Sequence, residues 1–206
     1  MRKAEKEIVQ EHTPCVTGCL MMISYMRRNE EREKKCMRTR HVVVLPYDSG
    51  WKDAFDMIAG EIYEALGSLA MSVEHVGSTS VPGLSAKPII DMDVVIRCRD
   101  VLPEVISALH GIGYIHEGDL GIPGREAFRY EGKEHLMEHH LYVCPPDSSE
   151  LRRHIAFRDY LRSHPAAVRE YGRIKEEAAR LYPEDIDGYI SYKSPFIERI
   201  YEELGL

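Results

Sequence analysis

Two aspartates, Asp91 and Asp93, stand two residues apart in the apolar stretch 89–96. Side chains alternate between the two faces of a strand, so a strand here would turn both carboxylates to one side. Like charges roughly 6.5–7 Å apart repel each other unless a cation lies between them. Mg²⁺ or Mn²⁺ fits, because hard cations take one or two carboxylates together with phosphate oxygens. The pair therefore predicts a metal site that suits phosphoryl chemistry.

The alternative is an edge strand that exposes both aspartates to solvent. Ile89 and Val95 would share the aspartate face, and a solvated face would be polar throughout. This pattern favours the metal site over the solvated face.

A run of small residues precedes this stretch and predicts a phosphate-binding turn. Backbone N–H groups and hydroxyls without bulky side chains let a phosphate approach the main chain closely. The residues are Gly77, Ser78, Thr79 and Ser80. The turn would hold the phosphates while the following strand holds the metal.

A second strand is predicted at 139–144. Leu141 and Val143 would face the core, which leaves Glu138, His140 and Tyr142 on the opposite face with the two aspartates. His140 is assigned as a metal ligand or a general base, with Glu138 as an alternative third ligand and Tyr142 as a lining residue. A surface histidine held by its neighbours is the competing interpretation of His140.

Basic side chains would complement the phosphates. The candidates are Lys87, Arg125, Arg129, Arg158, Arg162 and Lys193. We assign Lys87, Arg125 and Lys193 to the phosphates and favour the last two, because each lies beside an aromatic residue or a strand. Charged residues in the middle of a helix face are usually solvated.

A rival interpretation from another enzyme class comes from His135-x-x-Glu138-His139, which matches a zinc-hydrolase pattern. That pattern needs a helix, yet the residues lead directly into the strand-like 141–144. If extended, His135 and His139 would lie about 13 Å apart and could not share one zinc ion.

Composition limits the remaining functional classes. The chain of 206 residues has a net charge of −7, which argues against non-specific binding to nucleic acid or anionic membranes. Its five cysteines form no Cys-x-x-Cys pair, and the apolar run 16–23 is too short to cross a bilayer. We expect a cytoplasmic protein without a membrane anchor; the oligomeric state stays open.

The fold expected from the pattern is α+β, a small mixed sheet with flanking helices and a C-terminal helical part. A disordered lead-in is expected for 1–40, a sheet core for 41–146 and helices for 147–206. Strands are predicted at 41–46, 73–76, 89–96, 127–130 and 139–144, the last two as an antiparallel hairpin. Helices are predicted from Trp51 to Leu66, after Asp100, after Asp147, after His164, and from Ile186 with a break at Pro195.

Several motifs together resemble the GrpB family across about residues 41–204. They are Leu45-Pro46-Tyr47-Asp48, His75-Val76-Gly77-Ser78-Thr79-Ser80-Val81-Pro82-Gly83-Leu84, Ala86-Lys87-Pro88-Ile89-Ile90-Asp91, the strand 139–145, the segment 157–165 and Tyr192-Lys193. The resemblance implies a fold of the nucleotidyltransferase superfamily related to DNA polymerase β, and a cytoplasmic location. It implies no specific reaction.

The chain departs from the superfamily pattern at one position. A third acid usually stands on the neighbouring strand, where this sequence offers Glu138, His140 and Tyr142. Two functions therefore stay open: a metal-dependent nucleotidyltransferase with an unknown acceptor, and a catalytically degenerate module that binds nucleotide.

Overall fold

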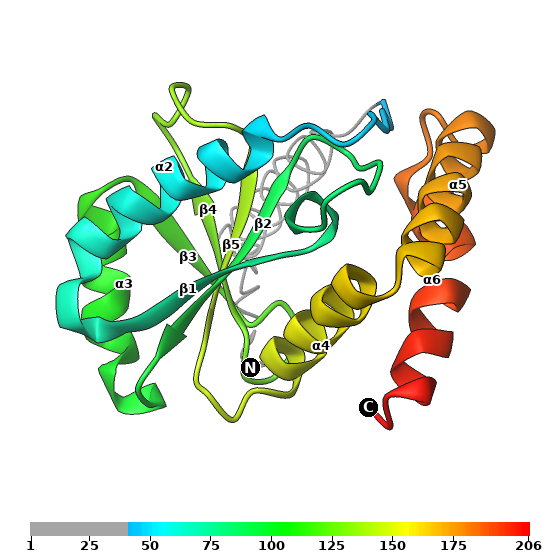
Figure 1. Cartoon of the computed structure of the whole chain (residues 1–206). Coiled ribbons are helices and arrows are strands. Elements are labelled where there is room, and N and C mark those ends of the chain that lie inside the picture. The colour runs from blue at the N-terminus through cyan, green and yellow to red at the C-terminus, as the bar shows by residue number, and fades with distance from the viewer. Residues whose placement is uncertain (1–40) are drawn as a thin grey trace, which may run out of the picture. The chain divides into compact units, whose positions relative to one another are not determined.

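A five-stranded mixed sheet forms the centre of the computed structural model, which describes residues 41–206 (Figure 1). The strands are β1 (Ala70–Val76), β2 (Ile90–Ile96), β3 (Tyr114–Gly118), β4 (Glu126–Tyr130) and β5 (His139–Cys144). Their order is β1-β2-β5-β4-β3; β2 and β5 are parallel, and the other neighbours are antiparallel. The lead-in expected at 1–40 lies outside the described residues.

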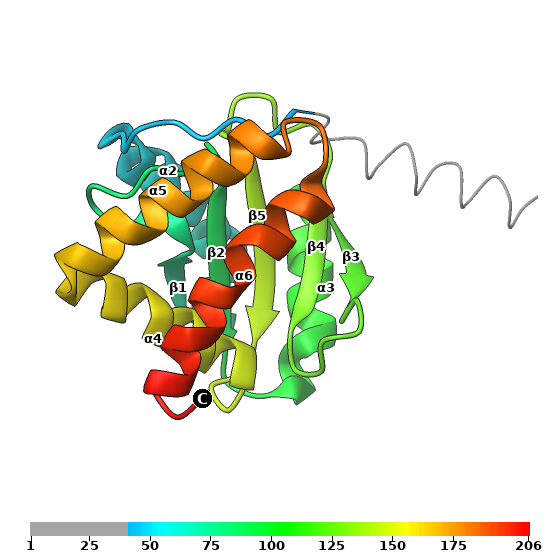
Figure 2. The same ribbon diagram turned by 90° about the vertical axis from the view of Figure 1, so that its right-hand side faces the viewer.

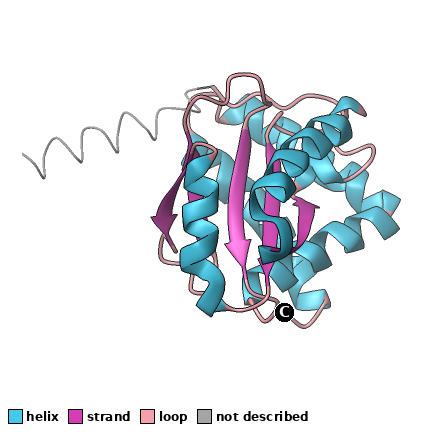
Figure 3. Ribbon diagram, turned by 90° about the vertical axis from the view of Figure 1, so that its left-hand side faces the viewer, coloured by secondary structure: helices cyan, strands magenta, loops and turns pink. Residues whose placement is uncertain are grey.

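Helices cover both faces of this sheet. The two helices on one face are α2 (Gly50–Leu66) and α3 (Leu102–Gly111). The C-terminal helices α4 (Ser149–Ser163), α5 (Pro165–Leu181) and α6 (Ile186–Glu203) lie on the other side, as Figure 2 shows. Figure 3 gives the view from the opposite side. The α+β class with a C-terminal helical region is confirmed.

The main core lies between the sheet and the α2–α3 layer because β2 alternates as its sequence predicts. Ile90, Met92 and Val94 are fully buried among the side chains of this core. The intervening positions turn to the side of the C-terminal helices, where Val95 packs with Cys144 and Leu151. Since β2 lies between β1 and β5, the edge-strand alternative for the two aspartates is wrong.

The structure corrects the N-terminal part of the predicted fold. Segment 41–46 forms only an isolated bridge between Leu45 and Ala86, where a strand was predicted. The proline at 46 cannot donate to a ladder, which limits pairing there. The strand β3 was not predicted, because Tyr114–Gly118 is short and interrupted by polar residues.

The C-terminal helices bring two further corrections. Helix α4 is capped by Ser148, whose Oγ accepts from the Leu151 N–H at 3.4 Å, instead of by Asp147. Helix α6 continues through Pro195, where a break was predicted. Burial of Tyr189, Phe196 and Ile200 along one face holds α6 together across the proline. Packing thus overrides the local cost of proline in a helix.

None of the helices described within 41–206 combines the length and the apolar character that a membrane crossing requires.

Candidate active site

Asp91 and Asp93 lie beside His140 and Tyr142 in the sheet. Parallel pairing of β2 with β5 sets Asp91 opposite His140 and Asp93 opposite Tyr142. Asp93 is fully buried, while the Asp91 side chain is 34% exposed. The two acids therefore form one polar site, with Asp93 at its base and Asp91 nearer to solvent.

Each aspartate has a histidine partner. The Nδ1 of His140 donates to Asp91 Oδ1 at 2.9 Å, and the Nδ1 of His154, from α4, donates to Asp93 Oδ2 at 2.8 Å. The hydrogen bond to Asp91 raises the pKa of His140 despite partial burial. Burial is the largest single influence on His154 and lowers its pKa, but the hydrogen bond to Asp93 and the charges of Asp93, Glu150 and Asp91 together raise the pKa overall. Both imidazoles thus tend to carry the positive charge that two neighbouring carboxylates attract.

The Asp91 carboxylate is held in its charged form. Burial alone would raise its pKa, but the His140 hydrogen bond and the charges of His140, Lys193 and His154 lower it overall. Asp91 is therefore an anion at neutral pH, as a metal ligand or a phosphate-site organiser must be.

Gly77 permits the close approach of the turn to Asp91. The residue has a φ of +67°, which L side chains rarely adopt, and an added Cβ would lie 2.8 Å from the Asp91 Cβ and collide with Oδ2. The turn continues as a short 3₁₀ helix, η3 (Ser78–Ser80). Only glycine at position 77 lets the backbone pass directly over the carboxylate.

Two hydroxyls assigned to phosphate are used within the turn. Thr79 Oγ1 donates to Ile89 O at 3.2 Å and is also hydrogen-bonded to His75. Ser80 Oγ donates to Gly77 O at 2.6 Å. Both side chains are buried and stabilise the turn itself. The Ser78 side chain is hydrogen-bonded to Tyr171, so the backbone of the turn is the part left for a ligand in the cleft.

Lysines from three segments surround Asp91. Lys87 Nζ lies 5.9 Å, and Lys193 Nζ of α6 lies 5.7 Å, from the centroid of the Tyr189 ring. Burial lowers the pKa of each, and the charge of Asp91 acts against that shift in both. The two lysines thus flank one aromatic ring and direct positive charge to the aspartate site.

Lys175 of α5 is a third lysine, which sequence reasoning missed. The residue is 1% exposed, and its Nζ has no hydrogen-bond partner within the described chain. Its Nζ lies 4.5 Å from the Tyr171 ring centroid. Burial and then the charge of Lys193 lower its pKa, while Asp91 counteracts them. A buried ammonium without a partner is costly, so the site is suited to an anionic ligand.

Arg125 and Tyr142 border the same polar face. The Arg125 guanidinium lies over the Tyr142 ring at 4.2 Å from its centroid, and its Nε is buried without a hydrogen-bond partner among the described residues. Glu138, at the approach to β5, is exposed, and its backbone O accepts a hydrogen bond from the Ile90 N–H at 2.9 Å. A stacked arginine with an unused donor is available for a phosphate oxygen.

The sequence contains weak signals for Lys175 and His154, the two site residues that sequence reasoning missed. Lys175 stands four residues after Tyr171 and three before Ala178, which places it on the buried stripe of α5. His154 stands three residues after Leu151 on α4, on the side that packs against the sheet. Both residues were passed over because a charged or polar residue on a helix is more often solvated.

One oxygen of the aspartate pair is available to a divalent cation. Asp93 Oδ1 is buried and has no hydrogen-bond partner in the described structure, so this oxygen is free to bind a metal. Residues 41–206 contain no group of three His, Cys, Asp or Glu side chains arranged to hold a metal. A cation here would therefore use Asp91 and Asp93, with ligand oxygens or water completing its coordination.

The zinc-hydrolase arrangement is absent from the described residues. His135 lies in a turn with Nε2 2.6 Å from Glu61 Oε1, and His139 lies in β5 with Nε2 2.8 Å from the Tyr114 hydroxyl. The Nδ1 of His139 donates to Met137 O at 2.8 Å. Because both ring nitrogens of His139 are occupied, the histidine pair has no common ligand position.

The chain belongs to the GrpB family: the family model described as GrpB protein matches residues 41–203. The glutamate-rich protein GrpB of Alkalihalophilus pseudofirmus is 31% identical over 166 residues, 79% of this chain and 95% of that protein. The UPF0157 protein YqkA of Bacillus subtilis is 33% identical over 159 residues, 77% of this chain, and the match spans 46% of its own length.

A solved structure is similar as well. The crystal structure of the conserved protein GrpB from Enterococcus faecalis has a TM-score of 0.70 and 35% identity, and the match covers 78% of this chain and 96% of that one.

Proposed function

We propose that this member of the GrpB family is a metal-dependent nucleotidyltransferase that acts on a nucleoside triphosphate and an acceptor yet to be identified. The observation that carries the proposal is the contact between Gly77 and Asp91. A small-residue turn passes directly over a carboxylate of an Asp-x-Asp strand, so a phosphate held by the turn lies next to the metal ligands. The arrangement agrees with the phosphate-binding turn and the aspartate metal site that the sequence predicts.

Each group then has a role that its position supports. Asp91 and Asp93 would hold Mg²⁺ or Mn²⁺, which when bound would neutralise charge on the transferring group. The Gly77–Ser78 backbone receives the phosphates, and Lys87, Lys175 and Lys193 balance their charge. Arg125 contributes a further donor from its position over Tyr142.

His140 is the general base of this proposal. Its Nδ1 is fixed by Asp91, and its side chain is 48% exposed, so an acceptor hydroxyl has access to the ring. Neutral His140 takes the acceptor proton at Nε2 while Asp91 stabilises the imidazolium that forms. Since Asp91 raises the pKa of His140, the rate should increase as pH rises through that pKa.

Nucleotidyl transfer is tested by release of pyrophosphate. The protein is incubated with labelled ATP, CTP, GTP or UTP, Mg²⁺ or Mn²⁺, and a pool of cell metabolites. We expect metal-dependent pyrophosphate release and a labelled product with at least one nucleotide. His140→Ala should abolish turnover while the metal–nucleotide complex still forms. Turnover that is unchanged in Asp91→Asn would contradict the proposed chemistry.

The second candidate function is a nucleotide-binding module without catalysis. It is favoured by one observation: the β5 positions paired with the two aspartates carry His140 and Tyr142, so β5 supplies no third acid there. A site with two acids can hold one cation and a nucleotide without the second metal of a two-metal mechanism. Tight metal-dependent nucleotide binding with no pyrophosphate release from any of the four nucleotides would support this function.

A further inference from the structure

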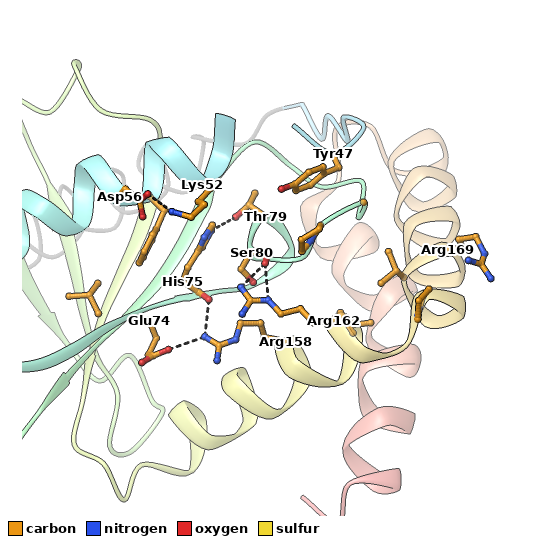
Figure 4. Close-up of a pocket in the computed structure, with 17 residues that line it drawn as sticks. Tyr47, Lys52, Asp56, Glu74, His75, Thr79, Ser80, Arg158, Arg162 and Arg169 are labelled. Carbon is orange, nitrogen blue, oxygen red and sulfur yellow. Dashed lines mark hydrogen bonds and ion pairs between the residues drawn. The ribbon is translucent and has the colours of Figure 1, made fainter. Parts of the chain in front are cut away.

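We propose that a cavity on the outer side of β1 is a second ligand site, which binds a small molecule with a flat apolar body and an anionic group. The cavity has a volume of about 870 Å³ and lies among β1, η3, α2 and the α4–α5 junction (Figure 4). Small-molecule sites commonly range from about 300 to 1,000 Å³. Asp91 and Asp93 are not among its lining residues, so it is distinct from the proposed nucleotide site.

Aromatic rings form the flat part of the lining. Phe55 and His75 are stacked with centroids 4.5 Å apart and planes 4° from parallel, and Tyr47 lies across the cavity from them. Burial lowers the pKa of His75 to about 4, so its ring is neutral at pH 7. Leu161 and Val168 extend this apolar surface. Such a wall favours a planar apolar group.

The opposite wall is cationic. Arg158 and Arg162, one turn apart on α4, point toward the strand and the turn (Figure 4). Arg158 is paired with Glu74 and Asp159 and donates to His75 O at 3.2 Å. Arg162 donates to Ser80 O through Nε at 3.1 Å and Nη2 at 2.8 Å, and its Nη1 lies 4.0 Å from Asp159. Its hydrogen bonds to Ser80 use only Nε and Nη2, so the Nη1 end of the guanidinium is available to a ligand.

The charge of the lining differs from that of the chain. The lining has four cationic residues (Lys52, Arg158, Arg162 and Arg169) and two acids (Asp56 and Glu74), a formal balance of +2 in a chain of net charge −7. Lys52 is paired with Asp56, and the guanidinium of Arg169 points away from the other labelled residues. Arg162 is therefore the main anion contact, with Lys52 at the rim. A phosphate or carboxylate would complement this wall.

Phenyl phosphate is the probe for this site, because it combines a planar aromatic ring with a doubly charged phosphate group. The ¹⁵N-labelled full chain is titrated with phenyl phosphate, with phenol as the ring alone, with inorganic phosphate as the charge alone, and with benzoate to compare carboxylate with phosphate. Amide shifts are followed without metal or nucleotide, so the outcome does not depend on the proposed nucleotidyl transfer. Arg162→Gln keeps a donor for Ser80 O, Lys52→Gln alters only the exposed rim, and Arg152→Gln is the control on an exposed face of α4.

We expect saturable shifts around His75 and Thr79–Ser80, with phenyl phosphate or benzoate binding more tightly than phenol or inorganic phosphate. Arg162→Gln should weaken binding about tenfold, as loss of a charged hydrogen bond does; Lys52→Gln should weaken it less, and Arg152→Gln should leave it unchanged. If Arg162→Gln does not fold, the affinity of Lys52→Gln for phenyl phosphate tests the proposal instead. Unchanged binding of phenyl phosphate to the folded Arg162→Gln and Lys52→Gln variants would overturn the proposal. Equal affinities for phenol and phenyl phosphate, or amide shifts confined to Asp91 and Lys193, would also overturn it.

Discussion

The contact between Gly77 and Asp91 is the most constrained feature of the candidate site. Gly77→Ala should destabilise the fold by about 1–3 kcal/mol and weaken metal–nucleotide binding at least tenfold, because the new Cβ displaces the carboxylate. Gly132→Ala is a matched control: its φ of +68° is nearly the same as that of Gly77, but an added Cβ meets nothing within 4 Å. Denaturant unfolding and calorimetric titration measure the two effects. Equal losses of binding in both variants would show that backbone strain, not the clash with Asp91, is responsible.

A buried histidine makes stability depend on pH. Burial lowers the pKa of His139 from its ordinary 6.5 to about 4, and the residue is 3% exposed. Its contribution to stability is therefore present above pH 6.5 and is lost as pH falls toward 4, because the unfolded chain takes up the proton first. The loss amounts to up to about 3 kcal/mol.

Urea unfolding at pH 7, 5.5 and 4.5 measures this loss. His139→Gln should give a flatter dependence on pH, although its stability at pH 7 is lower because the Tyr114 contact is weakened. His140 acts in the opposite direction: its raised pKa stabilises the fold at low pH and ceases to do so as pH rises through that pKa. A slope that is the same in the wild type and in His139→Gln would contradict the assignment.

The strands that carry the candidate site residues were predictable from the alternation of apolar and polar residues. Ile90, Met92 and Val94 read as one face of β2, which placed Asp91 and Asp93 on the other. The same reasoning placed His140 and Tyr142 on β5. Contacts between residues far apart in the sequence were not predictable. Helix periodicity shows which face of a helix is buried, but it does not show which residues that face contacts. Lys175 and His154 were missed for this reason, and α6 continues through Pro195 because packing outweighs local propensity.

Lys175 of helix α5 is expected to lower the stability of the fold and to strengthen nucleotide binding. Lys175→Met should raise the free energy of unfolding by about 1–3 kcal/mol, because methionine fills the same space without a buried unpartnered ammonium. The same change should weaken nucleotide binding if Lys175 meets a phosphate. Arg173→Met, on the exposed side of α5, should change neither property strongly. Destabilisation by Lys175→Met would show that the lysine serves the fold of the ligand-free protein.

At the scale of the whole molecule, charge is distributed unevenly. A chain of net charge −7 gathers lysines around Asp91 and arginines around the cavity behind the turn. The Gly77–Ser80 segment lies between these regions, with Gly77 against Asp91 and Ser80 against Arg162. The fold thus places one small-residue turn where it borders both the pair of aspartates and a basic cavity.

We propose above that Asp91 and Asp93 bind a divalent cation together with a nucleoside triphosphate. Calorimetric titration of ATP, CTP, GTP and UTP into the protein, with and without Mg²⁺ or Mn²⁺, tests it most directly. Asp53→Asn on the exposed side of α2 is the control for loss of one surface acid. We predict saturable, metal-dependent binding in the wild type and in Asp53→Asn, and its loss in the Asp91→Asn, Asp93→Asn double variant. Equal metal-dependent binding in the wild type and the folded double variant would contradict the claim.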